Sequence, residues 1–80
     1  MKVDRLMIQQ KNLEDSLNFK VGETLSSKEF DFLNEDLAIN YININTKTGF
    51  IEIKGDEDAF IWYSLSDIQF LSFNIEKSDK

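Results

Sequence analysis

The chain of 80 residues contains no cysteine, no histidine and no proline, and it has one arginine and three glycines. Without cysteine it can form neither a disulfide framework nor a thiolate metal site. Without histidine it lacks the residue that most often performs general acid–base catalysis. The glycines are scattered, so they form no glycine-rich loop that could cradle a phosphate. We therefore predict that the protein is not an enzyme and that it has no catalytic residues, metal site or cofactor.

Long apolar runs are also missing from the sequence. No such run follows the polar start Met1 to Arg5, as a signal peptide requires, and none reaches the roughly 20 residues of a membrane-spanning helix. We therefore expect a cytoplasmic protein that does not bind membranes.

Positive charge is scarce, and the net charge at pH 7 is −6. Proteins that bind nucleic acids draw much of their affinity from Lys and Arg side chains against phosphate, and this chain has no basic cluster. Direct binding to nucleic acid is therefore not expected. The basic surface of a partner protein, by contrast, would attract this chain.

The length predicts one small domain over residues 1–80, with a polar tail at 76–80 that we expect to fray. A chain of this size buries only about 60% of the surface that its unfolded form exposes. A homodimer or a complex with a partner would add stability.

Two helices are predicted in the first half. Helical spacing favours a helix over most of Val3 to Phe19, and an alternative interpretation divides this segment into a strand and a short helix. The strand would run from Arg5 to Gln9, and Asn12 would cap the helix. Farther along, Ser26 and Glu29 form a Ser-x-x-Glu capping box, which predicts a second helix ending near residue 35.

The second half predicts an antiparallel sheet. A hairpin with a turn at residues 46–49 brings Ile42, Ile44, Ile51 and Ile53 onto one face. Residues 60–63 and 70–75 are predicted as two further strands, with a single helical turn near Ser66 between them. The predicted fold class is therefore α+β, with one or two short helices packed on a three- to four-stranded antiparallel sheet.

Acidic residues form two groups that could together present a row of negative charge. The groups are Asp31, Glu35 and Asp36, in or just after the second predicted helix, and Asp56, Glu57 and Asp58 on one turn. Such a row could imitate the phosphates of a nucleic acid and occupy a basic groove of a partner. The alternative is that both groups simply face water. The second group offers oxygen ligands, but its spacing lacks the pattern of a calcium-binding loop.

Aromatic residues are the other candidate contact groups. In the predicted sheet, Tyr41 and Phe50 fall on the face opposite the isoleucines, and either Trp62 with Phe60 or Tyr63 with Ile61 must join them there. We select Tyr41, Phe50 and Trp62 as the aromatic residues that bind the partner. Exposed apolar patches mark interaction sites, and Trp and Tyr often anchor them. We predict a non-catalytic inhibitor or regulator that binds a protein, of the kind a phage or mobile element uses to block a basic enzyme acting on nucleic acids. The alternative is a small structural or oligomerising module, such as a virion or homodimer component.

Overall fold

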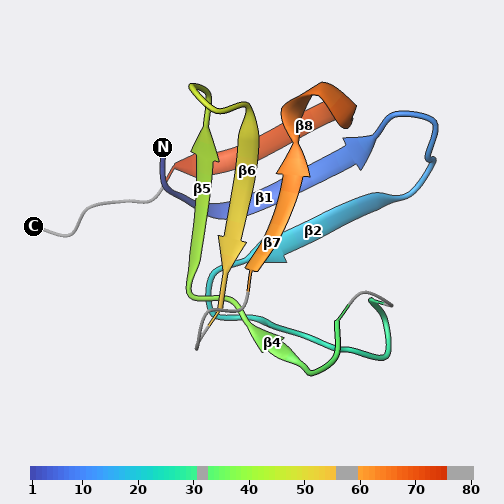
Figure 1. Ribbon diagram of the computed structural model, residues 1–80, viewed down its shortest axis with the longest axis vertical. Helices are drawn as coiled ribbons and strands as arrows, with labels where there is room; N and C mark the ends of the chain where they lie inside the picture. The colour runs from blue at the N-terminus through green and yellow to red at the C-terminus, as the bar shows by residue number, and fades with distance from the viewer. Residues whose placement is uncertain (31–32, 56–59, 76–80) are drawn as a thin grey trace, which may run out of the picture.

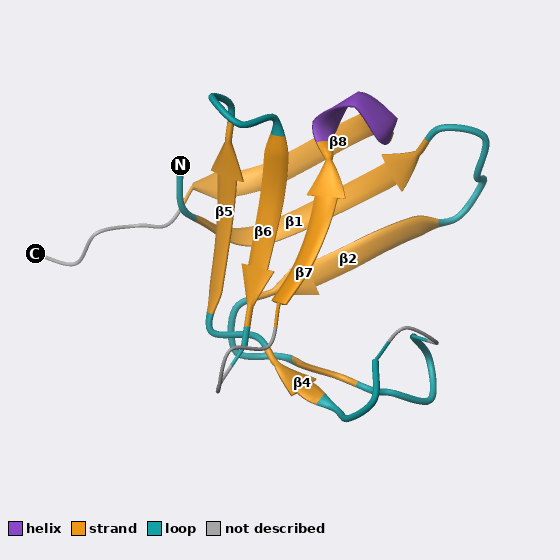
Figure 2. Cartoon of the chain, viewed as in Figure 1, coloured by secondary structure: helices purple, strands orange, loops and turns teal. Residues whose placement is uncertain are grey.

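The computed structural model describes residues 1–30, 33–55 and 60–75, and this part of the chain is almost entirely β-structure (Figure 2). Its strands are β1 (Val3–Gln10), β2 (Ser16–Lys20), β3 (Thr24–Leu25), β4 (Leu37–Ala38), β5 (Tyr41–Asn45), β6 (Phe50–Lys54), β7 (Phe60–Ser64) and β8 (Ile68–Ile75). One turn of 3-10 helix, η1 (Leu65–Asp67), joins β7 to β8. No helix in the described ranges is long and apolar enough to cross a membrane.

Two antiparallel three-stranded sheets form the body of the molecule (Figure 1). The front sheet has the order β5-β6-β7, and the rear sheet has the order β2-β1-β8. Strands of the two sheets run in clearly different directions, and a short β3-β4 pair lies below them (Figure 1). The α+β prediction is therefore wrong, because β1 and β2 occupy most of the first predicted helix and the described start of the second predicted helix is a turn.

The hydrophobic core lies between the two sheets, because each sheet turns its apolar side chains toward the other. Its fully buried members are Val3, Leu6, Ile8, Phe19, Ile39, Ile42, Ile51 and Ile53. Burial of these branched and aromatic side chains supplies the main force that holds the sheets together.

The predicted hairpin is confirmed residue by residue. Ile42 pairs with Ile53 and Ile44 pairs with Ile51, and all four side chains are buried. The turn closes at Gly49, whose φ of +83° favours glycine and whose N–H donates to the Asn45 carbonyl oxygen at 2.9 Å. A shift of one residue would move the isoleucines to the solvent face, so the alternating pattern fixes this register.

A β-bulge explains why the first predicted helix is wrong. The ladder between β1 and β8 shifts its register between Val3 and Arg5, which inserts an extra residue. Val3 and Leu6 both face the core as a result, although they stand three residues apart. That spacing imitates a helix. Asn12 does not cap a helix either, because it lies in the β1–β2 connection with a φ of +68°.

The described start of the second predicted helix forms a turn and not a helix. The N–H groups of Glu29 and Phe30 donate to the Ser26 carbonyl oxygen at 3.0 and 3.3 Å. The Ser26 hydroxyl accepts from the N–H of Lys28, two residues on, instead of forming the predicted capping box. The turn does not extend into a helix within the described residues, because Phe30 packs on the core beside Phe19. Residues 76–80, predicted to fray, lie outside the described part.

Candidate functional site

Aromatic side chains gather on the outer face of the front sheet. Phe50, Phe60 and Trp62 are 41, 47 and 62% exposed. Trp62 lies between the other two, with ring centroids 6.3 Å from Phe50 and 5.6 Å from Phe60. Tyr41 lies on the same face, because it pairs with Lys54, which pairs in turn with Phe60. Its side chain is half-buried. We call Tyr41, Phe50, Phe60 and Trp62 the aromatic face.

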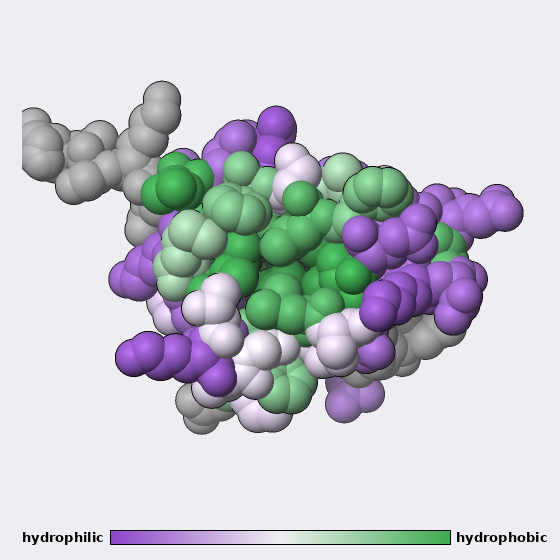
Figure 3. Space-filling model, turned by 90° about the horizontal axis from the view of Figure 1, so that it is seen from above, coloured by the Kyte–Doolittle hydropathy of each residue, from purple (hydrophilic) through white to green (hydrophobic). Residues whose placement is uncertain are grey.

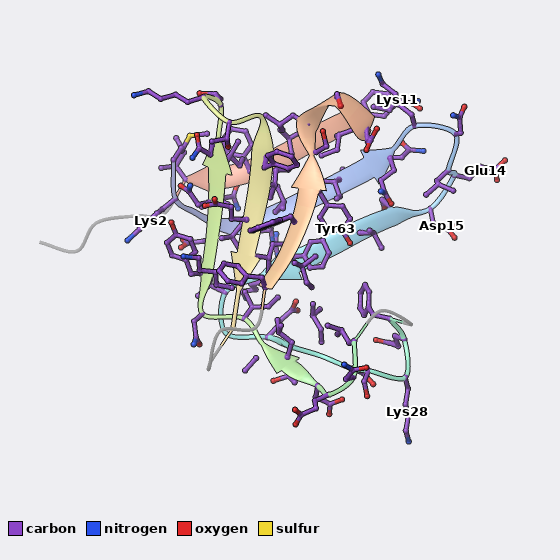
Figure 4. The ribbon with its side chains drawn as sticks, viewed as in Figure 1. Lys2, Lys11, Glu14, Asp15, Lys28 and Tyr63 are labelled. Carbon is purple, nitrogen blue, oxygen red and sulfur yellow. The ribbon has the colours of Figure 1, made fainter. Side chains whose placement is uncertain are left out.

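Two lysines lie against one end of the aromatic face. The Lys54 ammonium is 4.9 Å from the centroid of the Tyr41 ring and 5.2 Å from that of Phe60. The Lys2 ammonium is 5.4 Å from the Tyr41 centroid on the same side of the molecule (Figure 4). Such cation–π contacts help to hold the rings in place.

The first edge of the front sheet, at β5, is covered by the start of the chain. The Ile44 N–H donates to the Met1 carbonyl oxygen at 2.8 Å, and the Met1 ammonium donates to the Ile44 carbonyl oxygen at 2.9 Å. The same ammonium donates to Asn43 Oδ1 at 2.8 Å, and Lys2 forms a β-bridge with Asn43. Both main-chain groups of Ile44 on this edge therefore have partners.

The second edge, at β7, is open. Among the described residues no strand pairs with β7 on the side away from β6. A groove of about 640 Å³ runs along this edge, between β7 and β2. Its described lining residues are Gln10, Leu17, Glu29, Phe30, Phe60, Ile61, Trp62 and Tyr63. The aromatic face and the groove therefore share Phe60 and Trp62.

Aromatic packing forms the inner wall of the groove. Phe19 is fully buried, with its ring centroid 6.2 Å from that of Phe30 and 5.9 Å from that of Tyr63. Tyr63 extends from β7 toward β2 (Figure 4), and its burial raises the pKa of its hydroxyl above the usual value. Glu29 is the one charged residue among the described residues that line this groove.

The acidic residues singled out from the sequence are largely outside the described ranges. Asp31, Asp56, Glu57 and Asp58 lie in the segments 31–32 and 56–59 that the structure does not describe. Glu35 and Asp36 are exposed.

The carboxylate of Asp36 has a structural contact within the chain. Asp36 Oδ1 accepts a hydrogen bond from the Ser27 N–H at 2.9 Å. This bond is the largest cause that holds the pKa of Asp36 below its usual value. Asp36 therefore ties down the turn that carries Glu29 and Phe30. No group of three or more potential metal ligands lies together in the described residues.

The structure brings Tyr41, Phe50 and Trp62 together, as the alternation of the strands implies. Sequence reasoning left Phe60 out of the site, although its spacing of two from Trp62 places it on the same face. The groove could not be found in this way, because β2 and β7 are far apart in the sequence.

Comparison with protein-family models, with curated proteins and with solved structures finds no match to this chain. The function is therefore argued from the site itself.

Proposed function

We propose that this protein is a non-catalytic binding protein that docks a protein partner on the aromatic face. The observation that carries the proposal is the exposure of three neighbouring rings, Phe50, Phe60 and Trp62, in one row of contacts. Large rings left in water at a rigid sheet surface are typical of interaction sites, because burying them on binding releases free energy at little cost in side-chain entropy.

The charge of the chain favours a partner with a basic surface. A net charge of −6 attracts such a surface over a distance of about 10 Å, the screening length at moderate salt, and speeds association. We assign this steering to the acidic residues and the anchoring to the rings. In the most specific version, the partner is a basic nucleic-acid-handling enzyme in the cytoplasm, and this protein inhibits or regulates it.

Capture of the partner from a lysate of the native host, with wild-type and variant protein, tests this function. We expect Trp62→Ala to weaken capture by about 30-fold, the loss typical of a central anchor residue. Phe70→Ala is the matched control, since Phe70 is 57% exposed but lies on β8, outside the aromatic face. Equal capture by wild type and Trp62→Ala would refute the proposal.

A second candidate function is that of an oligomerising module, and β8 is the observation that favours it. β8 is an eight-residue edge of the rear sheet without a charged residue, and it exposes Phe70, Leu71 and Ile75 by 57, 36 and 61%. Figure 3 shows hydrophobic residues gathered at the end of the molecule where η1 lies. Long uncharged edges pair readily with other edges.

The molar mass in solution tests this second function. A dimer that becomes a monomer on the substitution Ser72→Lys, which adds a charge to the exposed edge strand, would support it. A wild-type protein that stays monomeric at high concentration would exclude it.

A further inference from the structure

β7 differs from an ordinary edge strand in its side chains. Exposed edges are usually protected by charged residues, proline, bulges or a covering segment. β7 has the sequence Phe-Ile-Trp-Tyr-Ser, with no charge and no proline. Phe60 and Trp62 are exposed on its outer side, whereas Ile61 is buried and Tyr63 is half-buried on its inner side. An open edge with large apolar groups on both sides is suited to an additional strand.

The groove beside β7 has the form that such a strand requires. It lies between the edges of β7 and β2, which belong to different sheets and pair with no strand on this side among the residues described. Leu17 and Phe30 join Tyr63 in giving it apolar walls. A strand placed there would find main-chain donors and acceptors along β7 and apolar contacts below it.

We propose that β7 binds an extended segment of a partner protein as a fourth strand of the front sheet. The proposal deepens the function proposed above and rests on it, because it names the form in which the partner binds. Side chains that point inward would enter the groove beside Tyr63. Side chains that point outward would lie next to Phe60 and Trp62 and so extend the aromatic face across the new strand.

The dimensions of β7 define the length of the segment. Five residues of β-strand span about 17 Å, so a partner segment of about five to seven residues would pair along the whole edge. Alternate residues of the segment would need to be apolar, because a strand places every second side chain on the same side.

The charge near the groove indicates a segment that carries lysine or arginine. Glu29 is the one charged residue among the described residues that line the groove, whereas Glu14 and Asp15 lie farther out on the β1–β2 connection, which also carries Lys11 (Figure 4). Lys28, next to Glu29 in the chain, points away from the groove (Figure 4). Opposite charge at the rim would orient a basic segment and exclude an acidic one.

The test uses a defined probe, a blocked nine-residue peptide of alternating lysine and valine, titrated into the ¹⁵N-labelled full chain. We expect a Kd below about 1 mM and chemical-shift changes centred on residues 60–64 and 16–20. We also expect hydrogen exchange of the β7 amides that point away from β6 to slow by about tenfold or more. Shift changes centred on β8, or β7 amides that exchange as fast with the peptide as without it, would overturn the proposal.

Two further peptides separate strand pairing from simple apolar contact. In each peptide, the backbone amides of every second residue are N-methylated, and the two peptides differ in which set of residues is modified. Since alternate N–H groups point to the same edge of a strand, each peptide lacks the hydrogen-bond donors of one edge. We expect one of them to lose binding by about tenfold or more and the other to keep it, because only one edge faces β7. Equal binding by both peptides would refute main-chain pairing. A glutamate–valine peptide that binds as tightly as the lysine–valine peptide would refute the charge preference.

Variants complete the test. Glu29→Lys should raise the Kd of the lysine–valine peptide by about five- to tenfold. Glu23→Lys reverses an exposed charge outside the groove lining and should leave this Kd unchanged. If both reversals weaken binding equally, the effect comes from net charge and the assignment of Glu29 is wrong. Hydrogen exchange of the β7 amides is also measured without peptide at several protein concentrations. If it slows as the protein concentration rises, a second copy of the chain occupies the edge, and the proposal is overturned.

Failure of this inference and failure of the proposed function are distinguishable. If Trp62→Ala abolishes capture of the partner but the peptides leave β7 exchange unchanged, the aromatic face binds the partner without strand addition. If the peptides protect β7 but Trp62→Ala captures the partner as wild type does, the groove accepts strands and the aromatic face is not the docking surface.

Discussion

The two outer strands of the front sheet, β5 and β7, have the same length but different neighbours. At the edge of β5, Met1 forms hydrogen bonds with Asn43 and Ile44, and Lys2 forms a β-bridge with Asn43. In the part of the chain that the structure describes, the edge of β7 borders a groove and not another strand. β5 alternates isoleucine with polar or tyrosine residues, whereas four of the five residues in β7 are large and apolar. The comparison teaches that one sheet can have one edge covered by its own chain and the other left open among the described residues.

The largest expected effect comes from truncating a buried isoleucine on each of the two edge strands. Ile42→Ala on β5 and Ile61→Ala on β7 should each lower the free energy of unfolding by about 3 kcal/mol, measured in urea. Hydrogen exchange should separate the two variants. We expect Ile61→Ala to release β7 by local opening, because within the described ranges β7 has a partner strand on one side only. Ile42→Ala should instead accelerate exchange throughout the front sheet. The same exchange pattern in both variants would argue against an edge of lower stability at β7.

A smaller effect is expected at the covered edge. Asn43→Ala removes the acceptor of the Met1 ammonium and the amide that donates to Glu52 Oε1 at 3.2 Å, and it should cost about 1 kcal/mol in urea unfolding. Asn18→Ala, an exposed asparagine on β2, is the matched control and should change stability by less than about 0.5 kcal/mol. Faster exchange of the Ile44 amide in the Asn43 variant alone would show that the cover of β5 has loosened.

The smallest expected effect concerns pH at the open edge. Burial raises the pKa of Tyr63 above its usual 10.0, so the folded state holds this proton more tightly than the unfolded state does. The resulting stability is fully present below pH 10.0 and is lost as the pH rises through the folded-state pKa. Between about pH 9 and about pH 11, wild type should therefore lose more stability than Tyr63→Phe, measured by thermal unfolding. Equal losses would mean that Tyr63 is more exposed than its packing against Phe19 implies.

The sequence predicts those elements of the fold that are encoded by neighbouring residues, and it fails where contacts between distant residues decide the structure. The β5–β6 hairpin was predicted in its correct register, because alternating isoleucines and a turn ending at Gly49 are read within a dozen residues. The predicted helix over Val3 to Phe19 was wrong because a bulge between Val3 and Arg5 gave a strand the spacing of a helix. The alternative strand from Arg5 to Gln9 was closer to β1. At Ser26, contacts of the turn with Phe19 and Asp36 overrode the local preference for a helix.

The candidate site was predictable to the same extent. Alternation places Tyr41 and Phe50 on one face, but the sequence left open whether Trp62 with Phe60 or Tyr63 with Ile61 joins them. The pairing of Trp62 with Glu52 in the structure settles which set lies there. The groove depends on β2 lying close to β7, with Phe19 beside Tyr63, and no local pattern encodes that contact. Asp36 was selected for its charge, whereas its contact with Ser27 shows a role in holding a turn.

The pairing of β1 with β8 has a consequence for the order of folding. β1 is the central strand of the rear sheet, and its partners include Ile75 for Val3 and Phe73 for Leu6. During synthesis on a ribosome, β1 emerges early and must wait for β8, whereas the β5–β6 hairpin can form as soon as it leaves the exit tunnel. Until β8 arrives, the main-chain groups on that edge of β1 have no strand to pair with.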